Sequence, residues 1–431
     1  MRAADATAVA TRGTDALVAA AGMAVGLEAK RLLGSCYGER VAVLAGPGLN
    51  GSDGRVAAAW LRSRGAVVDV VEVAHQPPRL DGYALVIDAA FGLGCARPYS
   101  APDVEPGTLV LAVDLPSGVN ADTGEIMGAP LLADVTLALG ALKYAHLTGD
   151  AAAVMGQLRF AGLGIVEQFV DGLIDDGDLV SLFEGRADDH KWKHAVQALV
   201  GSTHMPGAAE LVVRGALAGG ASMIRLSSRG EVAGSVHLPP EVVHTDDVEV
   251  DQRCRCVVAG PGLGPDAASW LRERLRTVRV PVVLDADGLD RALVDDVRPR
   301  DVAWILTPHE GEFVRLSGAP LGSNRFEAVR TLARELDCVV LLKGPTTLIA
   351  APDGTLRVVR SGTAALATAG TGDVLAGLIA ATIARGHDVM TAGALAAHLH
   401  GRAGSRLGPY APASALVGEV GEILQILSEV Q

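Results

Sequence analysis

The sequence predicts an α/β protein of two domains, and three observations lead to this prediction. The chain has 431 residues, whereas a single domain usually has about 100 to 200. Short apolar runs typical of buried parallel strands alternate with helical patterns. This alternation is interrupted by an acidic segment at 165–186, which we interpret as the connection between the domains. We therefore place the domains at residues 1–175 and 188–431.

The first half is typical of a sheet with helices on both faces, that is, a Rossmann-like three-layer αβα domain. Apolar residues recur at helical spacing over residues 15–33. A buried strand at 41–45 leads into a glycine-rich segment, 46–54, and then into a helix at 55–64. The other strands are expected to be short continuous apolar runs, because both of their faces are covered. These runs lie at 67–73, 84–87 and 109–113.

The strand pattern restarts after the connection, so the second domain is also expected to be α/β. A strand at 196–200 precedes a helix near 208–219, and long helices follow from residue 372 to the end. The run Pro352-Asp-Gly354 is typical of a hairpin turn. The remaining strands are expected at 256–259, 282–284, 303–306 and 339–342.

Composition and charge favour a small-molecule partner. The net charge is −13 and no basic cluster stands out, which argues against nucleic acid or an anionic membrane surface. No stretch of about 18 apolar residues is free of charge, Gly or Pro, so no membrane segment is expected. The five cysteines are odd in number and scattered, which indicates a reducing compartment, the cytoplasm. Helices rich in small residues weakly favour self-association.

Polar residues follow three strands of the first half, at the edge where open α/β sheets bind ligands. Asn50 and Asp53 follow the first strand, Asp88 ends the third, and Asp114 and Ser117 follow the fourth. Oxygen atoms of these types suit a cation, and glycine amides suit a phosphate. Each feature alone is also typical of a tight turn or a helix cap, so the predicted site depends on their occurring together.

These segments resemble the NAD(P)H-hydrate epimerase domain over about residues 15–160. The shared motifs are Gly46-Pro-Gly-Leu-Asn-Gly-Ser-Asp-Gly54, Asp88-Ala-Ala-Phe-Gly-Leu-Gly94, Asp114-Leu-Pro-Ser-Gly118 and Ala141-Leu-Lys143. The resemblance implies a potassium ion bound by Asn50, Asp88 and Ser117. It implies substrate contacts from Asp53, Gly92, Gly94 and Asp114, with Asp114 as the acid/base nearest the nicotinamide ring. Leu49 stands where the family usually has a second Asn.

The second half contains Thr368-Ala-Gly-Thr-Gly-Asp373 directly before a helix. The amides of Gly370, Thr371 and Gly372 would then lie at a helix N-terminus, where they can hold a phosphate. The Asp373 carboxylate beside them could accept a hydroxyl proton during phosphoryl transfer. The alternative is that Asp373 is an ordinary first-turn acid stabilised by the helix dipole.

This motif and four others occur in the order seen in the ADP/ATP-dependent NAD(P)H-hydrate dehydratase, a family with a ribokinase-like fold. The four are Gly260-Pro-Gly-Leu-Gly264, Leu284-Asp-Ala-Asp287, Thr307-Pro-His-Glu-Gly-Glu312 and Leu342-Lys-Gly-Pro-Thr-Thr347. This resemblance, over about residues 190–404, implies adenine-nucleotide binding by Lys343, Gly344, Thr346, Thr347 and Gly372. It implies contacts to the hydrated nicotinamide from Ala208, Gly262, His309 and Asp373, with Asp373 as the catalytic base.

Together the two resemblances predict an enzyme that repairs hydrated nicotinamide nucleotides. Water added across the C5–C6 bond of NADH or NADPH gives two C6 epimers, collectively NAD(P)HX. The first domain would interconvert the epimers, and the second would dehydrate the S form with ADP or ATP and Mg²⁺. One alternative is a ribokinase-type small-molecule kinase. In another, which Leu49 favours, the first domain only binds a ligand or partner.

Overall fold

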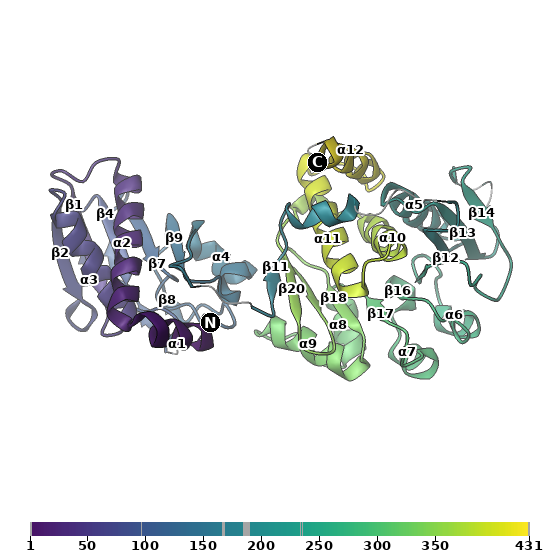
Figure 1. Cartoon of the computed structure of the whole chain (residues 1–431), viewed down its shortest axis with the longest axis horizontal. Coiled ribbons are helices and arrows are strands. Elements are labelled where there is room, and N and C mark those ends of the chain that lie inside the picture. The colour runs from purple at the N-terminus through teal and green to yellow at the C-terminus, as the bar shows by residue number, and fades with distance from the viewer. Residues whose placement is uncertain are drawn as a thin grey trace. The chain divides into compact units, whose positions relative to one another are not determined.

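The computed structural model describes residues 2–95, 97–165, 169–183, 190–232, 234 and 236–429 (Figure 1). Its contacts divide the chain into two compact units, Met1–Gln168 and Phe169–Gln431. The predicted start of the second domain, residue 188, lies outside the described residues. Residues 169–175, which the sequence analysis assigned to the first domain, belong by their contacts to the second unit.

The first unit contains a six-stranded parallel sheet in the order β10-β9-β7-β4-β1-β2. Its strands are β1 (Arg40–Ala45), β2 (Val67–Glu72), β4 (Leu85–Ala89), β7 (Leu109–Val113), β9 (Val135–Leu139) and β10 (Gln157–Ala161). The four predicted strands are confirmed, whereas β9 and β10 were not predicted. The order changes direction between β1 and β4, and ligands bind at such a switch point in open α/β sheets.

Two short pairs, β3 (Arg79–Leu80) with β6 (Asp103–Val104) and β5 (Tyr99–Ser100) with β8 (Gly128–Ala129), lie outside this sheet. The helices of the unit are α1 (Arg2–Arg12), α2 (Thr14–Leu33), α3 (Leu49–Arg62) and α4 (Gly149–Met155). The predicted helix over 15–33 is confirmed as α2.

The prediction that a helix begins at residue 55 is wrong, because α3 begins at Leu49. The glycines of this segment allow close packing rather than a loop. A Cβ on Gly51 would lie 1.9 Å from the Gly46 carbonyl oxygen, and one on Gly54 would lie 2.6 Å from Ala89 Cβ. Asn50 is therefore in the first turn of a helix that packs tightly against the end of β1.

The second unit contains a ten-stranded sheet in the order β11-β20-β19-β18-β17-β16-β15-β12-β13-β14. The pairs β18–β19 and β19–β20 are antiparallel and the others are parallel. Its strands are β11 (Gly172–Leu173), β12 (Ala195–Ser202), β13 (Met223–Arg229), β14 (Val242–His244), β15 (Cys256–Ala259), β16 (Val282–Leu284), β17 (Trp304–Leu306), β18 (Val339–Leu342), β19 (Thr347–Ala350) and β20 (Leu356–Val359). All strands predicted for this half are confirmed, as is the hairpin turn, which joins β19 to β20.

The core of the second unit lies around α10, which is buried along almost its whole length. A helix that is apolar all round is typical of such a central position. A Cβ on Gly377 would lie 2.1 Å from the Val212 carbonyl oxygen, so α10 and α5 touch backbone to backbone. The helices are α5 (Pro206–Ala218), α6 (Ala267–Leu275), α7 (Arg291–Val297), α8 (Glu310–Ser317), α9 (Arg325–Leu336), α10 (Thr371–Ala384), α11 (Val389–Arg406) and α12 (Ala415–Glu429).

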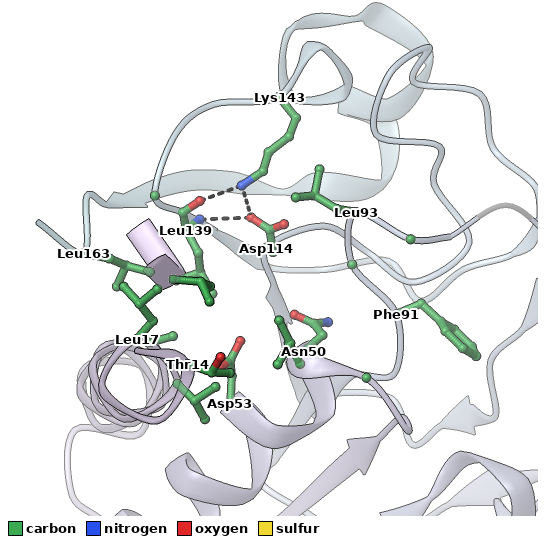
Figure 2. Close-up of a pocket in the computed structure, with 18 of the residues that line it drawn as sticks. Thr14, Leu17, Asn50, Asp53, Phe91, Leu93, Asp114, Leu139, Lys143 and Leu163 are labelled. Carbon is green, nitrogen blue, oxygen red and sulfur yellow. Dashed lines mark hydrogen bonds and ion pairs between the residues drawn. The ribbon is translucent and has the colours of Figure 1, made fainter. Parts of the chain in front are cut away.

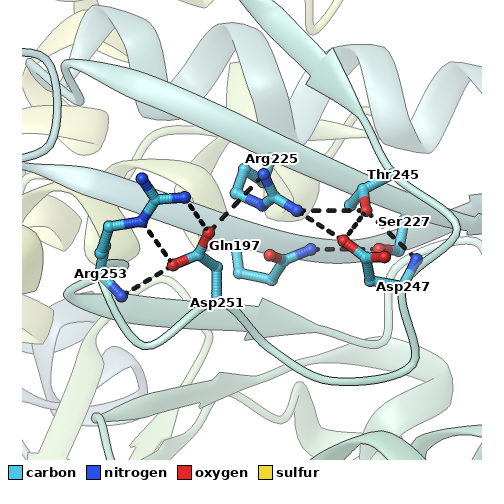
Figure 3. A network of polar contacts seen from close by, with 7 residues as sticks. All are labelled: Gln197, Arg225, Ser227, Thr245, Asp247, Asp251 and Arg253. Atoms are coloured by element: carbon cyan, nitrogen blue, oxygen red, sulfur yellow. Dashed lines mark hydrogen bonds and ion pairs between the residues drawn. The ribbon is translucent and has the colours of Figure 1, made fainter.

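A polar network fixes the connection from β14 to β15 against the sheet (Figure 3). Arg225 of β13 donates to Asp247 Oδ2 at 2.8 Å, and Gln197 Nε2 of β12 donates to Ser227 Oγ at 3.1 Å. Arg253 pairs with Asp251 at 2.7 Å. The five cysteines are buried and free. None of the helices in the described part of the chain combines the length and apolarity needed to span a membrane.

Candidate active sites

The first unit has a cavity of about 550 Å³ (Figure 2). It is lined by residues that follow β1 and β4, so it lies at the switch point of the sheet. The predicted residues that line it are Asn50, Asp53, Gly92, Gly94 and Asp114. Leu17, Val18 and Leu163 add an apolar wall that the sequence analysis did not predict.

Asp114 is held rigidly at the edge of this cavity. Its carboxylate accepts a hydrogen bond from Leu139 N at 3.0 Å and forms an ion pair with Lys143. Lys143 N donates to His146 Nδ1 at 2.9 Å, so the ring hydrogen is on Nε2, which donates to the Asp114 carbonyl oxygen at 2.7 Å. These contacts stabilise Asp114 at a φ of 67°, in the left-handed region.

Asp53 faces the same cavity in a different environment. Only 7% of the residue is exposed, and no donor among the described residues bonds to its carboxyl group. Burial, together with the negative charge of Asp114, raises the pKa of Asp53 to about 7. Asp53 therefore gains or loses a proton near neutral pH.

The residues predicted to bind potassium lie around the turn after β4. Ser117 N and Oγ donate to the two carboxylate oxygens of Asp88 at 2.8 and 2.6 Å, and Ser117 Oγ accepts from Phe91 N at 2.8 Å. A Cβ on Gly92 would lie 3.3 Å from Asn50 Cγ. Asn50 Nδ2 is buried and, among the described residues, has no partner. If the Asn50 amide is flipped, its oxygen takes the place of Nδ2 and is left without a partner. The oxygen atoms of Asn50, Asp88 and Ser117 therefore fit a cation that prefers oxygen ligands.

In the second unit, Asp373 lies in the first turn of α10, behind Gly370 at the N-cap. Gly370 has a φ of 91°, which favours glycine. Burial raises the pKa of Asp373 to about 7, the charge of Asp285 adds to the rise, and the charge of Lys343 opposes it. The predicted combination of helix N-terminus and carboxylate is therefore present, with a carboxylate suited to act as a base near neutral pH.

Lys343 lies next to this turn. Lys343 Nζ is 2.7 Å from Asp285 Oδ1 and 3.8 Å from Glu312 Oε2, and a Cβ on Gly372 would lie 3.5 Å from Lys343 Nζ. Burial alone would lower the pKa of Lys343, but the charges of Asp285 and Glu312 outweigh burial and raise it. Lys343 therefore carries a fixed positive charge beside the first turn of α10.

His309 and Gly262 lie in two other loops of the second unit. His309 caps α8, since its Nδ1 accepts from Gly311 N at 3.0 Å, and its side chain is 60% exposed. A Cβ on Gly262 would lie 2.6 Å from Ala208 Cβ, so these two predicted residues are adjacent. Gly344 and Thr346 lie in the loop that follows Lys343, and Thr347 is the first residue of β19 at the end of this loop.

Four residues that hold these sites together were given no role from the sequence. They are Lys143 and His146 in the first unit, and Asp285 and Glu312 in the second. Lys143, Asp285 and Glu312 lie within the motifs quoted above, so the motifs contained the signal. The role of His146 depends on a tertiary contact and has no sequence signal.

Two protein-family models match the chain. The model described as NAD(P)H-hydrate dehydratase matches residues 196–425, and the model described as YjeF-related protein N-terminus matches residues 14–82 and 74–145. The bifunctional NAD(P)H-hydrate repair enzyme Nnr of Mycobacterium tuberculosis (strain H37Rv) is 36% identical over 425 residues, covering 90% of this chain and 88% of the relative. The enzyme of the same name from Synechocystis is 32% identical, covering 85% and 81%.

Solved structures match the second unit. The ADP/ATP-dependent NAD(P)H-hydrate dehydratase of Bacillus subtilis, co-crystallised with ATP/Mg²⁺, has a TM-score of 0.53 and 30% identity, covering 58% of this chain and 96% of that one. A ribokinase-like superfamily protein of Enterococcus faecalis has a TM-score of 0.54 and 20% identity, covering 61% and 98%. The second likeness shows the fold alone.

Proposed function

The chain belongs to the family of bifunctional NAD(P)H-hydrate repair enzymes, and we propose that its two units divide the repair between them. The first unit interconverts the R and S epimers of NAD(P)HX, and the second dehydrates the S epimer with ADP or ATP. The single observation that carries this proposal is the buried Asp373 at the anion-binding turn of α10, beside the cation of Lys343. The comparisons do not support the alternative of a kinase with an inactive first domain.

In the second unit, the reaction makes a poor leaving group into a good one. Asp373 takes the proton of the C6 hydroxyl group while the hydroxyl oxygen attacks the terminal phosphorus of the nucleotide. The nucleotide leaves with one phosphate fewer. The C6–O bond then breaks as phosphate departs and C5 loses a proton, which restores the double bond. Lys343 and the amides of Gly370 and Gly372 stabilise the charge on the transferred group.

We assign the nucleotide to Lys343, Gly344, Thr346, Thr347 and Gly372, and the hydrated ring to Ala208, Gly262, His309 and Asp373. The adjacency of Gly262 to Ala208, and of Lys343 to Gly372, supports both assignments. Magnesium would arrive with the nucleotide and would neutralise charge on its phosphates.

In the first unit, we assign substrate contacts to Asp53, Gly92, Gly94 and Asp114. Asn50, Asp88 and Ser117 would hold a potassium ion, which would offset the negative charge of the carboxylates toward a pyrophosphate group. The five buried thiols support a cytoplasmic location. Self-association stays a prediction.

The dehydratase assignment is tested with the full chain, the S epimer and ADP or ATP. We expect one NADH and one inorganic phosphate for each nucleotide consumed, because phosphorylation and elimination follow each other. A simple kinase would instead accumulate a phosphorylated product without restoring NADH, and that result would contradict the proposal.

A further inference from the structure

We propose that Asp53, rather than Asp114, carries the proton when the two epimers interconvert, and that Asp114 acts with Lys143 as a fixed charged pair. This inference rests on the proposed epimerase function and assigns its acid/base residue. Both carboxyl groups face the same cavity, so both are within reach of one substrate.

The two carboxyl groups differ in their contacts. In Figure 2 dashed lines join Asp114 to Lys143 and to Leu139, and none reaches Asp53. Asp114 accepts from both Leu139 N and the Lys143 ammonium group. These two donors hold the Asp114 carboxylate in one position, and one of them is a charged partner.

Asp53 has neither restraint. It is buried on α3 with no donor from the described residues, and the helix backbone fixes its position at the cavity wall. The free carboxyl group can therefore exchange its proton with a substrate hydroxyl rather than with a protein partner. This geometry suits a proton carrier.

The charges around Asp53 favour titration near neutral pH. Burial and the Asp114 charge raise the pKa of Asp53 to about 7. Among the described residues, Arg55 on the same helix pairs with Glu72, and Asp88 bonds to Ser117. Lys143 also lines the cavity, and Arg12 and Asp15 lie close in sequence to Thr14, another lining residue. Of these charged groups, Asp114 is the one that raises the pKa of Asp53.

The chemistry needs one group that can both remove and return a proton. C6 of the hydrate carries a hydroxyl group and is bonded to the ring nitrogen N1, so it can open as a cyclic hemiaminal does. Asp53 takes the hydroxyl proton, the O–H electron pair forms the C6 carbonyl, and the C6–N1 pair moves to N1. N1 then receives the proton from Asp53. Rotation about C5–C6 and the reverse steps close the ring as the other epimer, with atoms and electrons balanced.

The fixed pair then has a separate task. The charge of Asp114 contributes to the raised pKa of Asp53, and the fixed position of Asp114 limits how the ring can lie. Asp114 is thus a positioning residue for the proton transfer, and Lys143 and His146 hold it in place.

The test measures epimer exchange by the full chain, separating R and S forms by chromatography and subtracting the uncatalysed rate. We expect Asp53→Asn to lower kcat at least about a hundredfold, the usual scale for loss of a positioned base. We expect Asp114→Asn to keep measurable exchange and to move the inflection of kcat/KM from near 7 to lower pH, because a charge that raises the pKa of Asp53 is removed.

Asp103→Asn, an exposed acid of the same unit, is the matched control and should exchange epimers at the wild-type rate. Unfolding temperatures of all variants check that the unit is folded. Exchange by Asp53→Asn within threefold of wild type, or loss of all exchange in a folded Asp114→Asn, would overturn the assignment but leave the epimerase function standing. Absence of exchange in the wild type would overturn both.

Discussion

Among the residues that the structure describes, Asp53 in the first unit and Asp373 in the second are buried aspartates whose pKa is raised to about 7. In both cases burial is the largest cause and a neighbouring carboxylate adds to it. Each neighbouring carboxylate, Asp114 or Asp285, is itself paired with a lysine. The two sites thus reach the same acid/base range through the same arrangement of charges.

At Asp373 this arrangement predicts a loss of chemistry without a loss of binding. Asp373→Asn should lower dehydration of the S epimer at least about a hundredfold, because the base is removed. Adenine-nucleotide affinity should stay within a few-fold, since the amides of α10 are unchanged. Titration calorimetry and NADH formation measure the two effects, and near-wild-type turnover would remove Asp373 from the mechanism.

The pKa of Asp373 also sets a pH dependence. The base must be deprotonated, and its pKa is raised to about 7, so the rate should be full above this pH and fall about tenfold per unit below it. The measurement is kcat/KM for the S epimer from pH 5.5 to 8.5, a range chosen to bracket the predicted inflection at roughly 7. A rate independent of pH down to 5.5 would contradict the prediction.

The sequence indicated candidate site residues because their types occur at strand ends in recognisable motifs. Asn50, Asp53 and Asp114 were placed in one cavity correctly. The ion pair of Lys143 with Asp114 was not predicted, because it brings together residues from two different strand ends. The contrast between Asp53 and Asp114 depends on this pairing and could not be derived from spacing.

At the scale of elements, close glycine contacts decide how helices pack. Gly377→Ala should destabilise the second unit by about 1–3 kcal/mol, because its Cβ would lie 2.1 Å from the Val212 carbonyl oxygen and α10 would have to move. Gly418→Ala on α12 is the control, since its Cβ would meet nothing within 4 Å. It should be neutral or up to about 1 kcal/mol stabilising.

Urea unfolding, followed for both variants, checks this prediction through the midpoint and its slope. Equal midpoints for Gly377→Ala and Gly418→Ala would show that α10 and α5 tolerate separation.

Most strands that are buried on both faces were predicted, because a continuous apolar run leaves few other structures, but β9, which is buried at every position, was missed. The missed strands β10 and β13 carry polar residues. β10 is a half-exposed edge strand, and β13 includes Arg225 and Ser227, which belong to the polar network. The start of α3 was missed because its glycines indicated a loop, whereas tertiary packing uses them inside the helix.

At the scale of the molecule, residues 169–183 belong to the second unit. Leu179 and Leu182 are part of its core, Arg330 pairs with Asp171 at 2.6 Å, and His398 lies 2.9 Å from Asp176. From the sequence this segment was expected to be a connection, because its many acidic residues outweigh the apolar signal of the two buried leucines.

A fragment of residues 169–431 should therefore fold and dehydrate the S epimer without exchanging epimers. A fragment beginning at 188 should be less stable by about 3 kcal/mol or more, because two buried leucines and β11 are lost. Thermal or urea unfolding of the two fragments compares them. Equal stability would show that residues 169–183 pack on the unit without supporting it.

The division of the repair between the two units is tested most directly by one time course. Full-length protein is given an equal mixture of R and S hydrate with ADP and potassium, and both epimers and NADH are followed. The proposal predicts that both epimers disappear completely in wild type, and that in Asp53→Asn the S form is converted rapidly while the R form remains at its uncatalysed rate of loss. Persistence of the R form in wild type would contradict the division of the repair, whereas rapid clearance of the R form by Asp53→Asn would contradict only the assignment of the proton carrier to Asp53.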